Sequence, residues 1–217
     1  MKITEVNTVL LTGPCTNDPF LSESRKLRSA SFIEIHTDTE LIGLGETFAG
    51  YCCPEFVPEI VAFFRPILIG QTADDIPELW RRMYACGNFW CRVGLGAMVL
   101  SGIEAALWDL AGKARRQPVW QLLGGTRHTR LPAYATGGPS NYPKSRLAAK
   151  VDHYLSLGFR GFKVGAGCFD QSQGWKMALG TTDPVAFEAD KAAFLRQHCG
   201  PEVRICLDGH MDNSPFG

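Results

Sequence analysis

The stretch GIEAALWDLAGKARRQPVWQLLGG, residues 102–125, belongs to the longest periodic apolar pattern in the chain. Apolar side chains recur at steps of four, four, three and four, which places them on one helix face: Leu95, Val99, Ile103, Ala106 and Leu110. Several glycines and alanines in the same stretch would let a neighbouring backbone approach closely. Arg115 and Arg116 supply positive charge at the helix C-terminus, and Pro118 cannot continue the helix. The stretch therefore predicts a long, tightly packed helix over residues 95–115.

Upstream of this helix, three short segments have the composition of β-strands: residues 3–11, 29–37 and 39–48. The polar run 36–40 suits a hairpin, so we expect an antiparallel meander. Residues 12–26 are rich in Pro, Asn, Asp and Ser and predict a long loop, a feature often used for lids or binding segments. Helical spacing then indicates two helices, one over residues 54–64 and one from Asp74-Asp75 to Met83.

Beyond residue 125 the pattern changes to an alternation of strands and helices. Strands are expected at residues 131–136, 159–166 and 203–207, with helices at 143–157 and 184–198. Such alternation predicts a right-handed, parallel βαβαβ unit, so we expect a domain boundary near His128. In parallel α/β folds, functional residues collect at the carboxyl ends of the strands.

Composition and charge argue against several classes of partner. The chain has 22 basic and 22 acidic residues and no run rich in Lys and Arg, which is unfavourable for binding a nucleic acid backbone. The longest apolar run, residues 56–69, is interrupted by Pro58, Glu59, Arg65 and Pro66 and cannot span a bilayer. The N-terminus lacks the apolar core of a signal peptide, so a cytoplasmic location is expected.

The eight cysteines do not have the spacing of a zinc site or a disulfide framework. No CxxC occurs, Cys52 and Cys53 are adjacent, and the others are scattered. We therefore expect reduced thiols in cores and loops.

Four motifs follow one another across nearly the whole chain. They are GLGET at residues 43–47, the 102–125 stretch, GFRGFKVGAG at 158–167 and VRICLDGHMD at 203–212. Together they resemble the mandelate racemase and muconate lactonizing enzyme branch of the enolase superfamily. The resemblance implies an α+β capping domain over residues 1–128. It places the first part of a (β/α)8 TIM-type barrel, with strands one to three, over residues 129–217.

The chemistry implied by this resemblance is proton abstraction next to a carboxylate. A Mg²⁺ ion binds the carboxylate of a small-molecule substrate, and a base removes the α-proton to give an enediolate. A Lys or His base acting with Mg²⁺ is a known pairing in this superfamily. The α-proton is a very weak acid, so positive charge near the developing enediolate is needed to make its removal feasible.

Two residues at the expected strand ends are candidates for the site. Asp208 follows the apolar run 203–207, where a carboxylate offers hard oxygens to Mg²⁺; the alternative is a turn or helix-cap Asp. Lys163 lies within an apolar strand, where a charge is costly unless it is paired or functional; the alternative is an edge Lys with its head in solvent. By resemblance, Asp208 is the first metal ligand and Lys163 is the first Lys of a Lys-x-Lys pair near the catalytic centre.

The chain departs from the family pattern at Gly165, which stands where the second Lys, the usual base, would be. Glycine cannot take a proton, so a base would have to come from later strands, commonly as a His-Asp pair. This favours a dehydratase over a racemase, which needs bases on both faces. His210 follows Asp208 in an Asp-x-His pattern that some sugar-acid dehydratases of the family carry, which suggests an acid or base. The alternative is a solvent-exposed loop histidine, and Asp212 is interpreted as a turn residue.

The loops at residues 12–26 and 49–53 match capping-domain loops that close over substrate. Arg25, Lys26, Tyr51 and Cys52 are therefore candidate substrate contacts. On the long helix, Asp109 and Lys113 are four residues apart and are interpreted as a surface ion pair.

The length of the second domain predicts an incomplete site. A full (β/α)8 barrel takes about 250 residues, whereas residues 130–217 allow about three strands. By resemblance, two further acidic ligands come from the fourth and fifth strands and the His-Asp base from the sixth and seventh. One Asp cannot give Mg²⁺ its near-octahedral coordination, so we expect a fragment that is inactive by itself.

The sequence thus predicts the N-terminal portion of a Mg²⁺-dependent acid-sugar dehydratase that forms a homo-oligomer when complete. The alternatives are a racemase, epimerase or cycloisomerase of the same branch, or a non-catalytic interaction module.

Overall fold

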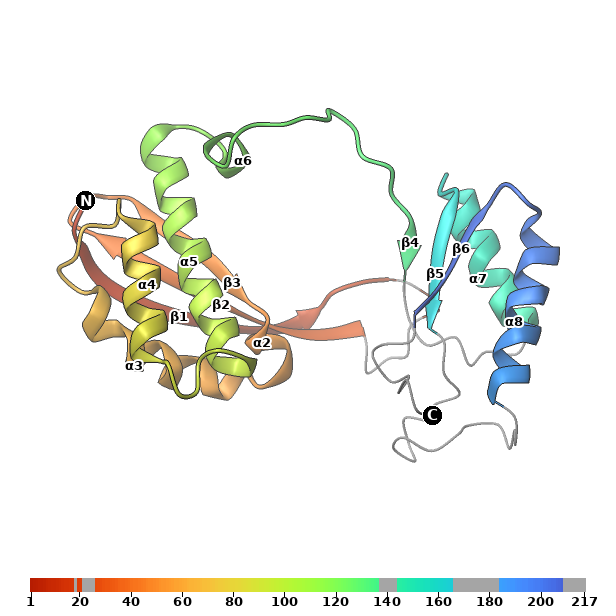
Figure 1. Ribbon diagram of the computed structural model, residues 1–217, viewed down its shortest axis with the longest axis horizontal. Coiled ribbons are helices and arrows are strands. Elements are labelled where there is room, and N and C mark those ends of the chain that lie inside the picture. Colours follow the sequence, from red (N-terminus) through yellow and green to blue (C-terminus); the bar gives the residue numbers. More distant parts are fainter. Residues whose placement is uncertain (18, 21–25, 137–143, 166–183, 209–217) are drawn as a thin grey trace. The chain divides into compact units, whose positions relative to one another are not determined.

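The computed structural model describes residues 1–17, 19–20, 26–136, 144–165 and 184–208 (Figure 1). The chain divides into two compact units. The first consists of Met1–Thr16 and Leu27–Thr129, and the second is made mainly of residues from Arg130 onward. Each unit has its own hydrophobic core.

The first unit contains the predicted antiparallel meander. Its strands are β1 (Ile3–Pro14), β2 (Leu27–Thr37) and β3 (Ile42–Thr47), in the order β1-β2-β3. The prediction of a loop over residues 12–26 was wrong at its N-terminal end, since β1 continues to Pro14, which pairs with Leu27. Polar side chains in this part of β1 and β2 contact each other across the strands, as in the 2.8 Å hydrogen bond between the Thr12 and Ser29 hydroxyls. Such cross-strand contacts stabilise the pairing of the two strands.

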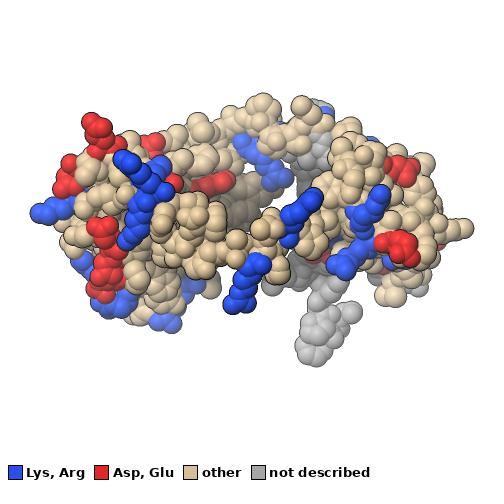
Figure 2. Space-filling view, turned by 90° about the horizontal axis from the view of Figure 1, so that it is seen from above, with Lys and Arg blue, Asp and Glu red and all other residues tan. Residues whose placement is uncertain are grey.

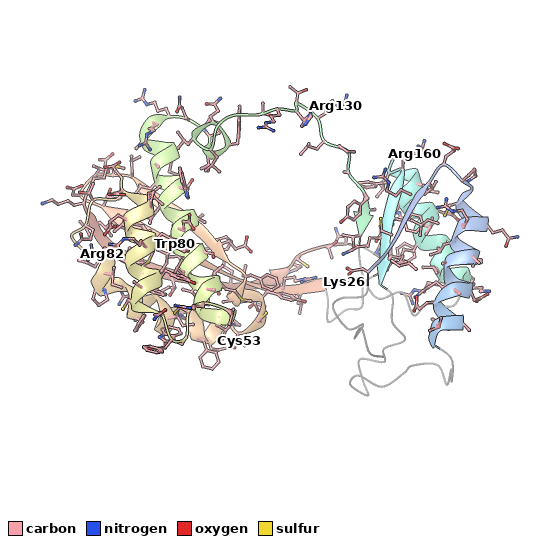
Figure 3. All side chains as sticks on the ribbon, viewed as in Figure 1. Lys26, Cys53, Trp80, Arg82, Arg130 and Arg160 are labelled. Carbon is pink, nitrogen blue, oxygen red and sulfur yellow. The ribbon has the colours of Figure 1, made fainter. Side chains whose placement is uncertain are left out.

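The helices after the meander are α2 (Ala49–Cys52), the 3₁₀ turn η1 (Pro54–Phe56), α3 (Val57–Leu68), α4 (Ile76–Cys86), α5 (Gly94–Arg115) and α6 (Val119–Leu122). Of these, α3, α4 and α5 correspond to the predicted helices, whereas α2 and α6 were not predicted. Asp75 caps α4 by accepting a hydrogen bond from the backbone N–H of Glu78. Trp80 on α4 stacks on Tyr84 with ring centroids 4.8 Å apart (Figure 3). The expected loop at 49–53 is instead the single turn α2, closed by the bond from Cys53 N to Ala49 O.

Helix α5 packs directly on β3, the strand that contains the GLGET motif (Figure 1). Glycines on both elements allow this close approach. A Cβ on Gly45 would collide with the carbonyl oxygen of Gly102 and lie 2.6 Å from the backbone N of Ala106. A Cβ on Gly102 would lie 2.8 Å from the Cβ of Thr47. Two of the four motifs that carry the resemblance, residues 43–47 and 102–125, therefore form one interface, in which backbone packs against backbone.

Side chains of α5 also satisfy the outer edge of β3. Asp109 accepts a 2.8 Å hydrogen bond from Leu44 N, and Lys113 donates a 2.7 Å bond to Ile42 O. The predicted ion pair between Asp109 and Lys113 is confirmed at 2.7 Å. Because β3 is an edge strand, these bonds occupy backbone groups that would otherwise have no ladder partner.

The second unit contains the predicted parallel sheet. Strands β4 (Ala135–Thr136), β5 (Gly161–Gly165) and β6 (Arg204–Asp208) lie in the order β4-β5-β6, with helices α7 (Lys144–Ser156) and α8 (Pro184–Cys199). Leu147, Phe162 and Leu195 are among the buried residues of its core. The strand predicted at 131–136 is only two residues long, because its ladder to β5 consists of two pairs, the first joining Ala135 to Phe162.

Helix α5 is the only described helix that is long and apolar enough to cross a membrane, and half of the relevant segment is buried inside the first unit. A buried core helix passes the same test, so this finding is weak evidence for a membrane span. On the face seen in Figure 2, Lys and Arg are interspersed with Asp and Glu, as expected for a chain with 22 residues of each sign.

Candidate metal centre

The second unit brings Lys163 and Asp208 together at the carboxyl ends of β5 and β6. In this parallel ladder Lys163 pairs with Cys206, and Gly165 pairs with Asp208. Paired residues lie on the same face of a sheet, so Lys163 and Asp208 project on one side. The Lys163 ammonium lies 2.5 Å from Asp208 Oδ2, with side-chain exposures of 29% and 25%. The candidate ligand and the candidate catalytic lysine are therefore direct neighbours.

The electrostatics of this pair keep Lys163 charged. The hydrogen bond that Lys163 donates to Asp208 raises the pKa of Lys163 above its usual value, and the charge of Asp208 adds to the effect, while desolvation opposes it. Tyr134 and Cys206 also raise the pKa of Lys163 and belong to its surroundings. The sequence analysis missed both residues. Strand alternation could have indicated them, because Tyr134 lies two residues before Thr136, the β4 partner of Lys163.

The donor chemistry at Asp208 fits a hard divalent cation, but the described residues supply only part of a site. A carboxylate at the carboxyl end of a barrel strand is a suitable ligand for Mg²⁺. Among the described residues, no group of three or more His, Cys, Asp and Glu side chains could hold a metal. Asp208 is therefore a candidate ligand whose Oδ2 is already in contact with an ammonium group.

A second lysine, on helix α8, forms a hydrogen bond with the carboxyl end of β5. Lys191 on α8 is only 5% exposed and donates a 3.1 Å hydrogen bond to the carbonyl oxygen of Gly165 and a 2.9 Å bond to Glu188. The sequence analysis missed Lys191. It lies four residues after Phe187 and four before the buried Leu195, so helical spacing could have placed it on the inward face.

The remaining candidates lie elsewhere in the chain. Arg25 and His210 are outside the described residues. Tyr51 and Cys52 belong to α2 in the first unit, next to Cys53 (Figure 3). Tyr51 is 47% exposed and stacks against the guanidinium of Arg28, which lies 4.5 Å from the ring centroid.

The described cysteines are free thiols, and Cys52 is exposed. Cys168 lies outside the described residues. Helix α2 therefore presents an aromatic ring and a thiol to solvent.

Comparison with known families identifies the first unit. Residues 7–124 match the family described as mandelate racemase / muconate lactonizing enzyme, N-terminal domain. The chain belongs to this family. The fold predicted from the sequence is therefore confirmed: a mandelate racemase-type capping domain followed by the first part of a (β/α) barrel.

The relatives of this family member include named sugar-acid dehydratases. The arabinonate dehydratase of Saccharolobus solfataricus is 28% identical over 179 residues, which is 82% of this chain and 44% of the relative. The D-galactonate dehydratase of Klebsiella pneumoniae is 32% identical over 179 residues, with the same two coverages of 82% and 44%. The chain thus spans less than half the length of these relatives.

Solved structures of the family match both units. The 3,6-anhydro-D-galactonate cycloisomerase of Zobellia galactanivorans has a TM-score of 0.77 at 25% identity, covering 99% of this chain and 52% of that one. A racemase from Streptomyces coelicolor with bound magnesium also has a TM-score of 0.77 at 25% identity, covering 99% and 57%. Dehydratases, cycloisomerases and racemases all occur among the similar proteins.

Proposed function

We propose that this chain provides the capping domain and first barrel strands of a Mg²⁺-dependent enzyme that removes the proton alpha to a carboxylate of a sugar acid. Dehydration is the favoured reaction. The observation that carries the proposal is the contact between Lys163 and Asp208 at the carboxyl ends of β5 and β6. The named dehydratases among the relatives support the substrate class.

Within this proposal Asp208 is one metal ligand, and two further acidic ligands would come from the fourth and fifth barrel strands. When bound, Mg²⁺ would polarise the substrate carboxylate and stabilise the enediolate. Lys163 keeps a positive charge beside Asp208 and supports the substrate carboxylate or the base. Gly165 pairs with Asp208 and has no side chain to accept a proton, so the base comes from later strands. His210 acts as an acid or base near the metal.

The capping domain would contribute specificity. We assign residues 1–128 to this domain and residues 129–217 to the barrel, with Arg25, Tyr51 and Cys52 as substrate contacts. The exposure of Tyr51 and Cys52 leaves them accessible to a ligand. The proposal also includes a cytoplasmic location, a homo-oligomeric complete enzyme, and no turnover by the 217 residues alone.

A cycloisomerase of the same branch is the second candidate. The likeness to the Zobellia cycloisomerase favours it, because that match covers both units at a TM-score of 0.77. The two reactions share α-proton removal. They differ in whether water leaves or a ring opens, and both eliminations give a 2-oxo-3-deoxy acid. The acid that is consumed, an open-chain sugar acid or a 3,6-anhydro acid, therefore separates them.

To test the proposal, the chain is expressed together with any coding sequence that continues in frame after Gly217. The purified protein is then incubated in D₂O with arabinonate, galactonate or 3,6-anhydrogalactonate. Proton NMR follows loss of the α-proton signal and formation of 2-oxo-3-deoxy acids. We expect Mg²⁺-dependent product from a sugar acid, and its loss in Asp208→Asn. The proposal is contradicted if none of these acids changes, or if turnover is unaffected by Asp208→Asn.

A further inference from the structure

A group of exposed apolar side chains lies in the connection between α4 and α5 and on the neighbouring part of α3 (Figure 1). Phe89 and Val93 are 99% and 79% exposed, although both are apolar. Trp90, and Phe63 on α3, are 44% and 39% exposed. From the areas that aromatic side chains bury, this apolar patch of four residues exposes roughly 500 Å². A patch of this size on a folded unit is often a binding surface.

The apolar patch is held firmly by the first unit. The Trp90 ring packs edge-on against Phe63 with centroids 4.9 Å apart, and it lies 6.3 Å from the ring of the fully buried Phe64. The connection is closed by hydrogen bonds from Trp90 N and Cys91 N to Gly87 O, at 3.0 and 2.7 Å. A ring fixed in this way loses little conformational freedom when a partner covers it, and Trp is enriched among the residues that dominate binding energies.

Charges of opposite sign lie on the two sides of the apolar patch. Glu59 is exposed on α3, one helical turn before Phe63, so the two side chains share a helix face. Arg92 is exposed, follows Trp90 by two positions, and donates a hydrogen bond to the side chain of Asn88. In the described part of the chain, neither Glu59 nor Arg92 forms an ion pair. An acid, two aromatic rings and a base therefore follow one another across this surface.

We propose that the apolar patch binds the same patch on a second copy of the chain across a twofold axis. Rotation by 180° about the pair of rings brings Glu59 of each copy opposite Arg92 of the other, so the surface is complementary to itself. The two patches bury roughly 1,000 Å² of apolar surface, and with four charged side chains the contact reaches the lower range of specific interfaces, about 1,200 Å². The inference names the interface of the homo-oligomer in the proposed function and uses none of the proposed catalytic residues.

The test is sedimentation velocity on the 217-residue chain at low salt, without metal or substrate. For a contact of this area we expect a dissociation constant of about 1–100 µM, so the concentration runs from about 1 to about 200 µM. Phe89→Ser is the main variant, because a side chain that is 99% exposed contributes little to folding. Trp120→Ser is the matched control. It removes a half-exposed aromatic residue on α6, at the other end of α5 and about 33 Å away (Figure 1).

We expect Phe89→Ser to weaken the association by about tenfold or more, and Trp120→Ser to leave it unchanged, with circular dichroism confirming that both variants fold. The inference is overturned if the unmodified chain stays monomeric over the whole range, since something other than a second copy, such as a later segment of the chain, would then cover the patch. It is also overturned if the two variants weaken the association equally.

Reversal of the two charges tests the twofold arrangement. Glu59→Arg and Arg92→Glu each place like charges opposite one another, and each should weaken the dimer about tenfold at low salt. The double variant restores both contacts with opposite signs and should return the affinity to within about threefold of the original. A double variant as weak as the single variants would refute this arrangement.

The interface and the proposed function can fail separately. A dimer with these properties, in a protein that shows no turnover in the D₂O assay, supports the interface and contradicts the proposed function. Turnover by a protein whose 217-residue chain does not associate supports the proposed function and overturns the interface.

Discussion

Replacing Gly45 by Ala tests the interface on which the capping domain is built. The new Cβ would collide with the carbonyl oxygen of Gly102 and lie 2.6 Å from Ala106 N. Both are backbone atoms of α5, so no flexible side chain can move aside. Helix and strand would have to separate, which disturbs the buried α5 residues Ile103 and Leu107.

Overpacking of this kind costs about 1–3 kcal/mol, and the rigid backbone on both sides favours the upper value of about 3 kcal/mol. For a unit of this size we expect the melting temperature to fall by about 10 °C. Thermal and urea denaturation followed by circular dichroism would measure both quantities.

Gly13→Ala is the matched control within the same sheet. A Cβ there meets nothing within 4 Å, so the change should be neutral or stabilise by about 0.5 kcal/mol through the unfolded state. If Gly45→Ala and Gly13→Ala have the same melting temperature within about 2 °C, the close approach of β3 and α5 does not constrain Gly45, and the packing argument is refuted.

Three further predictions concern stability and reactivity. Asp109→Ala removes the bonds to Leu44 N and Lys113 and should cost about 1.5 kcal/mol in urea denaturation; an unchanged midpoint would show that the β3 edge does not depend on them. Ser31→Ala should leave stability unchanged or raise it by up to about 1 kcal/mol, because the fully buried hydroxyl has no hydrogen-bond partner; a clear loss would reveal an interaction of that hydroxyl. Burial raises the pKa of the Cys91 thiol to about 11. Between about pH 9 and about pH 11 the thiol ionises in the unfolded chain but not in the folded one, so the free energy of unfolding should fall as pH rises through this window. Cys91→Ala should reduce this pH dependence in urea denaturation.

Local patterns predicted the elements that carry their own signal. Helix α5 was expected over residues 95–115 and begins one residue earlier, because its apolar stripe and basic end need no partner to be recognised. The ends of β1 and β2 were missed, because pairing of Pro14 with Leu27 depends on the partner strand rather than on composition. The strand predicted at residues 131–136 was too long, because the length of β4 depends on the residues of β5 with which it pairs.

The candidate site shows the same limit. The sequence indicated Lys163 and Asp208 separately as strand residues, but only the register of β5 and β6 brings their charges to 2.5 Å. The hydrogen bonds that link Asp109 and Lys113 to the backbone of β3 could not be predicted from local sequence patterns either, because they join residues 65 and 71 positions apart. The support from Lys191 depends on how α8 packs against β5.

The most direct test of a metal site at Asp208 is a crystal structure of the chain soaked in Mn²⁺ at tens of millimolar, with the anomalous signal used to locate the ion. The account predicts a peak within about 2.5 Å of an Asp208 carboxylate oxygen. A peak elsewhere, or no peak near Asp208, would contradict it.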